Sequence, residues 1–275
     1  MNASLSSMRQ PALFLPHGGG PCFFMDWIPP DAWNRLRGFL EALPATLPER
    51  PRALLVISAH WEAPQFTAQR QAAPPLLFDY HGFPPHTYEL AWPAPGAPDL
   101  AEEVARRLAA AGLACGFDAR RGFDHGVFVP LLLAFPAADI PCAQLSLRAD
   151  LDPAAHLAAG RALAPLRDEG VLIVGSGNTY HNMSVMRRAM AGQEMSAQGL
   201  DFDAWLSEAV AHPDPAERER RLSEWDRAPG AREAAPREEH LMPLHVVAGA
   251  AGLDRGVKVF EDRILVALQS AFRFG

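Results

Sequence analysis

The run Leu54-Leu55-Val56-Ile57-Ser58-Ala59, which ends in His60, decides the fold. It is too short for a helix, but its unbroken apolar character suits a strand that is buried on both faces of a sheet. Comparable runs bounded by turn residues occur along the whole chain, and each is predicted to be a buried strand. They are Pro11–Pro16, Ala53–Ser58, Ile140–Leu147, Gly170–Val174 and Gly256–Phe260.

Helical patterns lie between these runs. Ala97–Ala111 places leucine and valine on one face, begins with Pro98 and is followed by Gly112, and Asp152–Asp168 has the same character. Strands that alternate with helices predict an α/β fold with a mainly parallel or mixed central sheet and helices on both faces. We expect residues 1–275 to form a single catalytic domain. The charged segment Arg187–Glu239 is predicted to form surface helices, either as a solvated face or as a lid.

The composition excludes several classes of protein. Of the 275 residues 49% are hydrophobic and 21% are charged, which is typical of a globular protein with a substantial core. The net charge of −7 argues against a nucleic-acid partner. No apolar run is long enough for a membrane span, and no signal peptide is recognisable. Three cysteines without paired spacing favour a reducing compartment, so the expected location is cytoplasmic.

Three of the ten histidines follow apolar runs. His17 comes directly after Pro11–Pro16, His60 ends the run quoted first, and His181 follows a third run through a glycine-rich turn. In open α/β sheets functional groups gather beyond the carboxyl ends of the strands. Neutral imidazole is a common ligand of zinc and ferrous iron, so we expect a metal site there. Taken singly, each could equally be a core or turn histidine.

Two further histidines are weaker candidates. His125 sits in a turn-like segment where Asp124 could orient an imidazole or could simply be a turn residue. His240 precedes an apolar stretch that reads as the start of a buried helix. The glycines at 18–20 and 175–177 match neither a dinucleotide fingerprint nor a P-loop, and Ser176 lacks the full nucleophile elbow of a serine hydrolase.

Read together, a series of blocks resembles the class III extradiol ring-cleavage dioxygenases, DOPA 4,5-dioxygenase type. The blocks span the chain from about Pro11 to Gly252. They are Pro16-His17-Gly18-Gly19, Ser58-Ala59-His60-Trp61-Glu62, Tyr80-His81-Gly82-Phe83-Pro84, Tyr88 through Pro93-Ala94-Pro95-Gly96, Phe123-Asp124-His125-Gly126, Gly175-Ser176-Gly177-Asn178-Thr179-Tyr180-His181-Asn182 and Glu239-His240-Leu241-Met242-Pro243-Leu244.

The resemblance implies a mononuclear metal site. His17, His60 and His240 would be the metal ligands, His181 the active-site base and a possible fourth ligand, and His125 a second catalytic histidine that contacts substrate or oxygen. Fe(II) is expected for activity, and Zn(II) is possible as the bound metal. The better-known members of the superfamily use two histidines and a glutamate, so the adjacent Glu239 could compete with His240 for the ligand role.

The activity that follows from the resemblance is cleavage of the aromatic ring of a DOPA-like catechol beside the diol, with O2 as the other substrate. The alternatives are a zinc-dependent hydrolase on the same scaffold and a non-catalytic relative that binds a metal or a peptide. Trp61, Phe83 and Trp92 are candidates for the walls of the ring pocket, although aromatic residues are more often plain core. No motif specifies the catechol or the oligomeric state.

Overall fold

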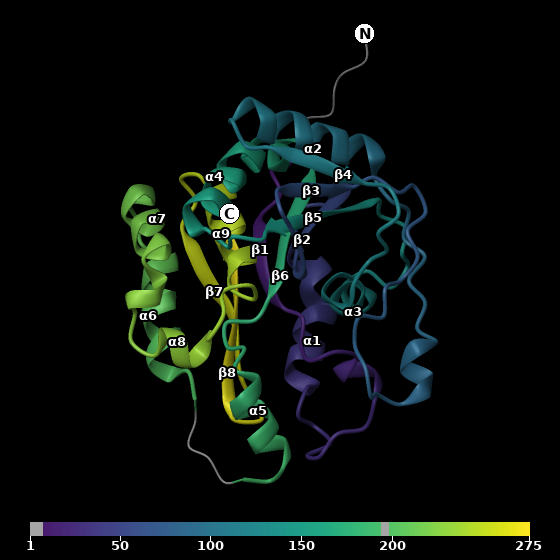
Figure 1. Ribbon diagram of the computed structural model, residues 1–275, viewed down its shortest axis with the longest axis vertical. Coiled ribbons are helices and arrows are strands. Elements are labelled where there is room, and N and C mark those ends of the chain that lie inside the picture. The colour runs from purple at the N-terminus through teal and green to yellow at the C-terminus, as the bar shows by residue number, and fades with distance from the viewer. Residues whose placement is uncertain (1–7, 194–197) are drawn as a thin grey trace.

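The computed structural model describes residues 8–193 and 198–275. Residues 194–197 of the charged segment therefore lie outside the described residues. The strands of the described part form one eight-stranded sheet in the order β4-β3-β5-β2-β6-β1-β8-β7 (Figure 1). Their bounds are β1 Ala12–Pro16, β2 Ala53–Ala63, β3 Phe66–Gln69, β4 Cys115–Asp118, β5 Cys142–Arg148, β6 Val171–Gly177, β7 Gly256–Ile264 and β8 Ala267–Phe274.

The centre of the sheet is parallel, as the apolar runs predict. β1 and β2 flank β6 and run parallel to it, and β5 runs parallel to β2 on its far side. The sheet is mixed because β8 pairs antiparallel with β1 and β3 pairs antiparallel with β5. The α/β prediction is confirmed. The carboxyl ends of β1, β2 and β6 consequently lie next to one another at one edge of the sheet.

Helices cover both faces of this sheet. They are α1 Asn34–Ala42, α2 Pro98–Ala110, α3 His125–Ala134, α4 Pro153–Leu163, α5 Met183–Met190, α6 Leu200–Val210, α7 Pro215–Ser223, α8 Ala231–Ala234 and α9 Met242–Ala250. Because side chains alternate along a strand, Phe14 of β1 packs in the core under α2, α4, α6 and α9, whereas Leu13 and Leu15 pack in the core under α1 and α3. In Figure 1, α1 and α3 lie to the right of β1 and β6, and α6 and α7 lie to the left.

Two expectations are corrected by the structure. Gly256–Phe260 begins β7, which alternates between buried and exposed residues and pairs antiparallel with β8, so this run is not a strand buried on both faces. The short edge strand β4, its neighbour β3 and the strand β8 were not among the predicted runs. The charged segment does form helices, α5 to α8, but they also bury side chains such as Phe202, Leu222 and Trp225 and are not merely a solvated face.

No helix in residues 8–193 and 198–275 combines the length and the apolar character needed to cross a membrane.

Candidate metal centre and substrate cavity

Three histidines meet at the carboxyl edge of the parallel strands. His17 follows β1 directly, His60 lies in β2 where its pairing with β5 is irregular, and His240 lies two residues before α9. One ring nitrogen of each lies within 4.8 Å of the others. Nε2 of His60 and Nε2 of His17 are only 3.1 Å apart. The structure thus brings together the three residues that the sequence analysis selected as metal ligands.

The approach of His240 depends on a glycine at the end of β6. A Cβ atom at Gly177 would overlap with the carbonyl oxygen of His240. That carbonyl accepts a hydrogen bond of 3.1 Å from the backbone N–H of Asn178. Any larger side chain at position 177 would push the His240 segment away from the sheet, because backbone atoms cannot yield as a flexible side chain can.

The proton of His17 is fixed by the hydroxyl of Ser176. This hydroxyl donates its hydrogen to the carbonyl oxygen of Gly126 and therefore must act as acceptor toward Nδ1 of His17, 3.0 Å away. His17 consequently carries its hydrogen on Nδ1, which leaves a lone pair on Nε2. The amide nitrogen of Asn178 lies 3.3 Å from this Nε2 and equally 3.3 Å from the carbonyl oxygen of Gly18, so it interacts only weakly with either.

Carboxylates play the same part for the other two rings. Nδ1 of His240 is hydrogen-bonded to Oε1 of Glu239 at 3.0 Å, and Nδ1 of His60 lies 3.6 Å from Oδ2 of Asp79. Nε2 of His240 is buried and has no hydrogen-bond partner among the described residues. Three Nε2 atoms with free lone pairs therefore face one another, which is the donor set that a zinc or ferrous ion requires.

All three rings are held in the neutral form that binds a metal. Burial, reinforced by the neighbouring imidazoles, lowers the pKa of His17 and of His240 well below the usual value. Burial and the nearby His125 lower the pKa of His60 to about 4, although Asp124 and Asp79 act in the opposite direction. A neutral imidazole keeps the lone pair that a metal ligand needs.

His125 stands beside this trio at the start of α3. Its backbone N–H and its Nδ1 both donate to Oδ1 of Asp79, at 3.0 and 2.8 Å. Burial would raise the pKa of Asp79, but the hydrogen bond and the charge of His125 outweigh burial and lower this pKa to about 2. Asp79 therefore orients His125 and lies near Nδ1 of His60, and Nε2 of His125 has no hydrogen-bond partner among the described residues.

His181 packs flat on His240, with ring centroids 3.3 Å apart and an angle of 18° between the planes. Its Nδ1 lies 3.3 Å from the same oxygen of Glu239 that holds His240. Burial would raise the pKa of Glu239, but the hydrogen bonds from His181 and His240 outweigh it, so the pKa is lowered and the group stays ionised. Glu239 contacts the Nδ1 side of both rings, away from the three Nε2 atoms.

Of the two possibilities for Asp124, the structure does not support the one in which it orients an imidazole. Its buried carboxylate accepts hydrogen bonds from Ser58 at 2.7 Å, from Arg121 at 2.8 Å and from Gln144. These bonds tie β2 and β5 to the start of α3, the helix that carries His125. Asp79 takes the expected role instead, and the sequence signal for it was only its place directly before the Tyr80–Pro84 block.

A cavity of about 490 Å³ opens onto the five histidines. This is a suitable volume for a small aromatic ligand. Phe83 lines it, as do Trp27, Trp33 and Leu265, which sequence reasoning did not single out. Trp61 and Trp92 were expected as possible walls but are not among the lining residues. Trp61 is covered by the guanidinium of Arg121, and Trp92 donates to the carbonyl oxygen of Phe135 in the core.

The sequence and the fold are both similar to those of known proteins. Residues 11–271 match the family described as the catalytic LigB subunit of aromatic ring-opening dioxygenase. The chain is 40% identical to a 4,5-DOPA dioxygenase extradiol of Beta vulgaris, over 74% of this chain and 75% of the relative. It is 35% identical to the protein of that name from Escherichia coli strain K12, over 90% of this chain and 87% of the relative.

Two further similarities extend over nearly the whole chain. A protein named dioxygenase tasH from Hapsidospora irregularis is 38% identical, over 93% of this chain and 82% of the relative. The crystal structure of an uncharacterized protein from Escherichia coli K12 superposes with a TM-score of 0.77 at 31% identity and covers 97% of this chain and 100% of its own.

Proposed function

The chain belongs to the family of the catalytic LigB subunit of aromatic ring-opening dioxygenases, and on this premise we propose how its histidines divide the work. It is an extradiol ring-opening dioxygenase. Its substrate would be a catechol with a DOPA-like side chain, which is cleaved beside the diol with O2. The family assignment favours this activity over the zinc-dependent hydrolase that the same three imidazoles would also permit.

One observation carries the proposal: each Nδ1 of the trio faces an oxygen acceptor while the three Nε2 atoms converge. His17, His60 and His240 would hold one divalent metal, with Fe(II) as the working ion and Zn(II) as an ion that the same donors accept. A ferrous ion there would supply the electron chemistry that O2 needs and a positive charge that favours the deprotonated diol.

His181 would be the base that takes a proton from the diol. Its Nδ1 lies toward the ionised Glu239, so Nε2 is the nitrogen available to accept a proton. The negative charge of Glu239 would stabilise the imidazolium that results. His181 could also appear as a fourth ligand, because its ring is stacked directly on His240. Glu239 would be a positioning residue for both rings.

His125 would be the second catalytic histidine. Asp79 holds its Nδ1 and its backbone N–H, so the orientation of the ring is fixed by two hydrogen bonds and Nε2 is available to the substrate. The ring lies 3.9 Å from that of His60, centroid to centroid, and therefore sits beside the proposed metal ligands. From this position it would hold or return a proton during ring opening.

Anaerobic loading with Fe(II), followed by a screen of catechols in an oxygen electrode, tests the proposal. We expect uptake of O2 and the appearance of a yellow semialdehyde absorbance in the same samples, with neither in the zinc-loaded control. If no catechol elicits O2 uptake, and the zinc-loaded protein instead hydrolyses ester or amide substrates without oxygen, the hydrolase alternative is correct.

A further inference from the structure

The α5 wall of the cavity carries chemistry that the histidines do not explain. Met183, Met186, Arg187 and Met190 all line the cavity and are spaced as neighbours along one face of a helix. α5 begins two residues after His181, so one short segment carries both the proposed base and this wall. With a rise of about 1.5 Å per residue, Arg187 lies roughly 6 Å along the helix axis beyond Met183. At this distance Arg187 is better placed to contact a substituent on the ring than to contact the diol.

The guanidinium of Arg187 has no hydrogen-bond or ion-pair partner within the part of the chain that the structure describes. Together with its place in the cavity, this makes Arg187 a cation that is available to a ligand. Its planar fork matches the two oxygens of a carboxylate, and such paired hydrogen bonds are stronger than those between neutral groups.

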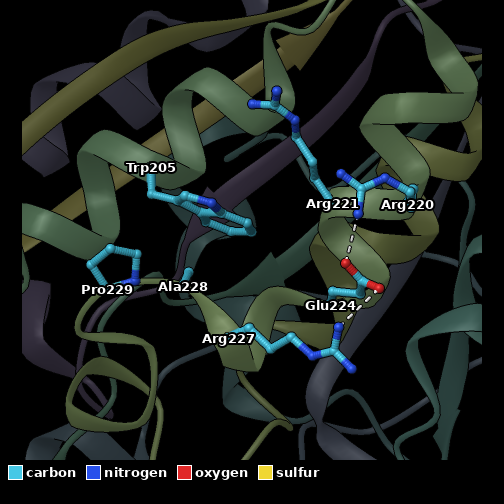
Figure 2. Close-up of a pocket in the computed structure, with 7 residues that line it drawn as sticks. All are labelled: Trp205, Arg220, Arg221, Glu224, Arg227, Ala228 and Pro229. Atoms are coloured by element: carbon cyan, nitrogen blue, oxygen red, sulfur yellow. Dashed lines mark hydrogen bonds and ion pairs between the residues drawn. The ribbon is translucent and has the colours of Figure 1, made fainter.

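Another group of arginines lies on the surface between α6 and α7, but these arginines are already paired with carboxylates. Figure 2 shows Glu224 between Arg220 and Arg227, at 2.7 and 3.2 Å. Glu217 of the same helix, α7, pairs with Arg221 at 2.8 Å. An anion would have to compete there with carboxylates that already compensate the charge.

The cavity also offers little to a cation on the ligand. Asp79 is the carboxylate among the described lining residues, and one of its two oxygens is already engaged in hydrogen bonds. Oδ1 accepts two hydrogen bonds from His125, and Oδ2 lies toward Nδ1 of His60. An ammonium group at Asp79 would have to compete with the imidazoles of His125 and His60 for this carboxylate.

We propose that Arg187 binds a carboxylate on the ring substituent of the catechol, such as that of a DOPA-like side chain, and thereby selects catechols that carry a carboxylate over neutral ones and over those whose only charge is an ammonium group. The methionines on the same face of α5 supply a flexible apolar surface for the linking carbons. This inference rests on the proposed function, because it identifies the substrate class of the same cavity.

The test compares Arg187→Gln with Arg188→Gln. Both arginines are exposed on α5 and both variants lose one positive charge, but of the two only Arg187 lines the cavity. Dihydrocaffeate is the acidic probe, 4-methylcatechol the neutral probe and dopamine the cationic probe. KM is measured with the iron-loaded enzyme under O2. The Kd of dihydrocaffeate is measured by calorimetry with zinc-loaded protein, so that this readout needs no turnover.

For the wild type we expect dihydrocaffeate to have the lowest KM and dopamine the highest. Arg187→Gln should raise the ratio of the dihydrocaffeate KM to the 4-methylcatechol KM roughly tenfold, and the calorimetric Kd by the same factor, as expected for loss of one charge-assisted pair. Arg188→Gln should change either quantity less than twofold.

Equal effects of the two variants, or a change in KM that is the same for the acidic and neutral probes, would overturn the assignment of Arg187. If the iron-loaded wild type opens 4-methylcatechol but the KM ratio does not respond, only the Arg187 inference fails. If the wild type opens none of the three catechols, the proposed function fails, and the inference fails with it.

Discussion

Two regions of the molecule bury histidines equally well but use them differently. His17 and His240 at the carboxyl edge of the sheet are 1% and 3% exposed, and His156 in helix α4 is 0% exposed. Nε2 of His156 accepts from the backbone N–H of Arg148 at 3.2 Å, and its Nδ1 donates to the carbonyl oxygen of Asp152 at 2.7 Å. Nε2 of His240 has no such partner in the part of the chain that the structure describes. Burial therefore does not mark a ligand, whereas a buried imidazole nitrogen without a hydrogen-bond partner points to one.

Substitution of the histidines at the carboxyl edge of the sheet should have the largest effects on metal content and on kcat. His240→Ala should lose bound metal, because it removes one of three converging nitrogens. His181→Ala should keep the metal but lower kcat by roughly 10²- to 10⁴-fold, the usual contribution of a general base. Metal content by mass spectrometry and steady-state kinetics measure the two effects separately.

His156→Gln is the matched control, since it removes an equally buried imidazole and should retain the full metal content. Equal metal content and equal rates in the His240 and His181 variants would contradict the division between ligand and base. Loss of metal from the His156 variant would break the comparison itself.

A smaller effect, on the free energy of unfolding, is expected from His156 of α4 as the pH falls. Burial lowers the pKa of His156 to about 4, although the hydrogen bond to Asp152 opposes the shift. Between the unfolded value near 6.5 and the folded value, the unfolded chain binds a proton that the folded chain does not. The stabilisation is therefore complete above about pH 6.5 and is lost as the pH falls toward 4, by up to about 3 kcal/mol.

Urea unfolding of metal-free protein at pH 7 and at pH 4.5 measures this loss. The loss should be smaller in His156→Gln than in the wild type, because the variant has no imidazole to protonate at this position. An identical decrease in both proteins would show that His156 does not sense the pH.

The smallest effect, on metal affinity, is expected from Glu239, whose carboxylate contacts the rings of His240 and His181. Glu239→Gln keeps the shape but removes the charge that orients His240 and His181, so metal affinity should fall roughly 10- to 100-fold, as for other residues that orient metal-bound histidines. This corresponds to about 1.4–2.7 kcal/mol. A competitive titration with a chromogenic zinc chelator provides the measurement.

Glu238→Gln is the neighbouring control, because Glu238 pairs with Arg232 on the surface, at 2.7 Å. Unchanged metal affinity in Glu239→Gln would mean that the carboxylate does not act on His240. A loss far larger than that range would indicate that Glu239 is itself a ligand.

Much of the fold could be predicted because its signals are local. The apolar runs of β1, β2 and β6 record burial on both faces, as does β5 although it contains Gln144 and Ser146, and the ends of three of these strands located His17, His60 and His181. The edge strand β4 and its neighbour β3 have four residues each and leave little apolar pattern, so the same reasoning missed them. The prediction that Gly256–Phe260 is buried on both faces was wrong, because β7 alternates between buried and exposed residues as a half-exposed strand does.

The sequence by itself determined the parallel centre of the sheet, the family blocks and the five histidines, since these follow from the order and spacing of residues along the chain. Only the tertiary structure decided which nitrogen of each ring is free, that Asp79 rather than Asp124 orients His125, and that α5 turns Arg187 toward the cavity. The physical reason is distance along the chain. His125 and Asp79 are 46 residues apart and His17 and Ser176 are 159 apart, so their hydrogen bonds arise from strand order and packing, which no local periodicity encodes.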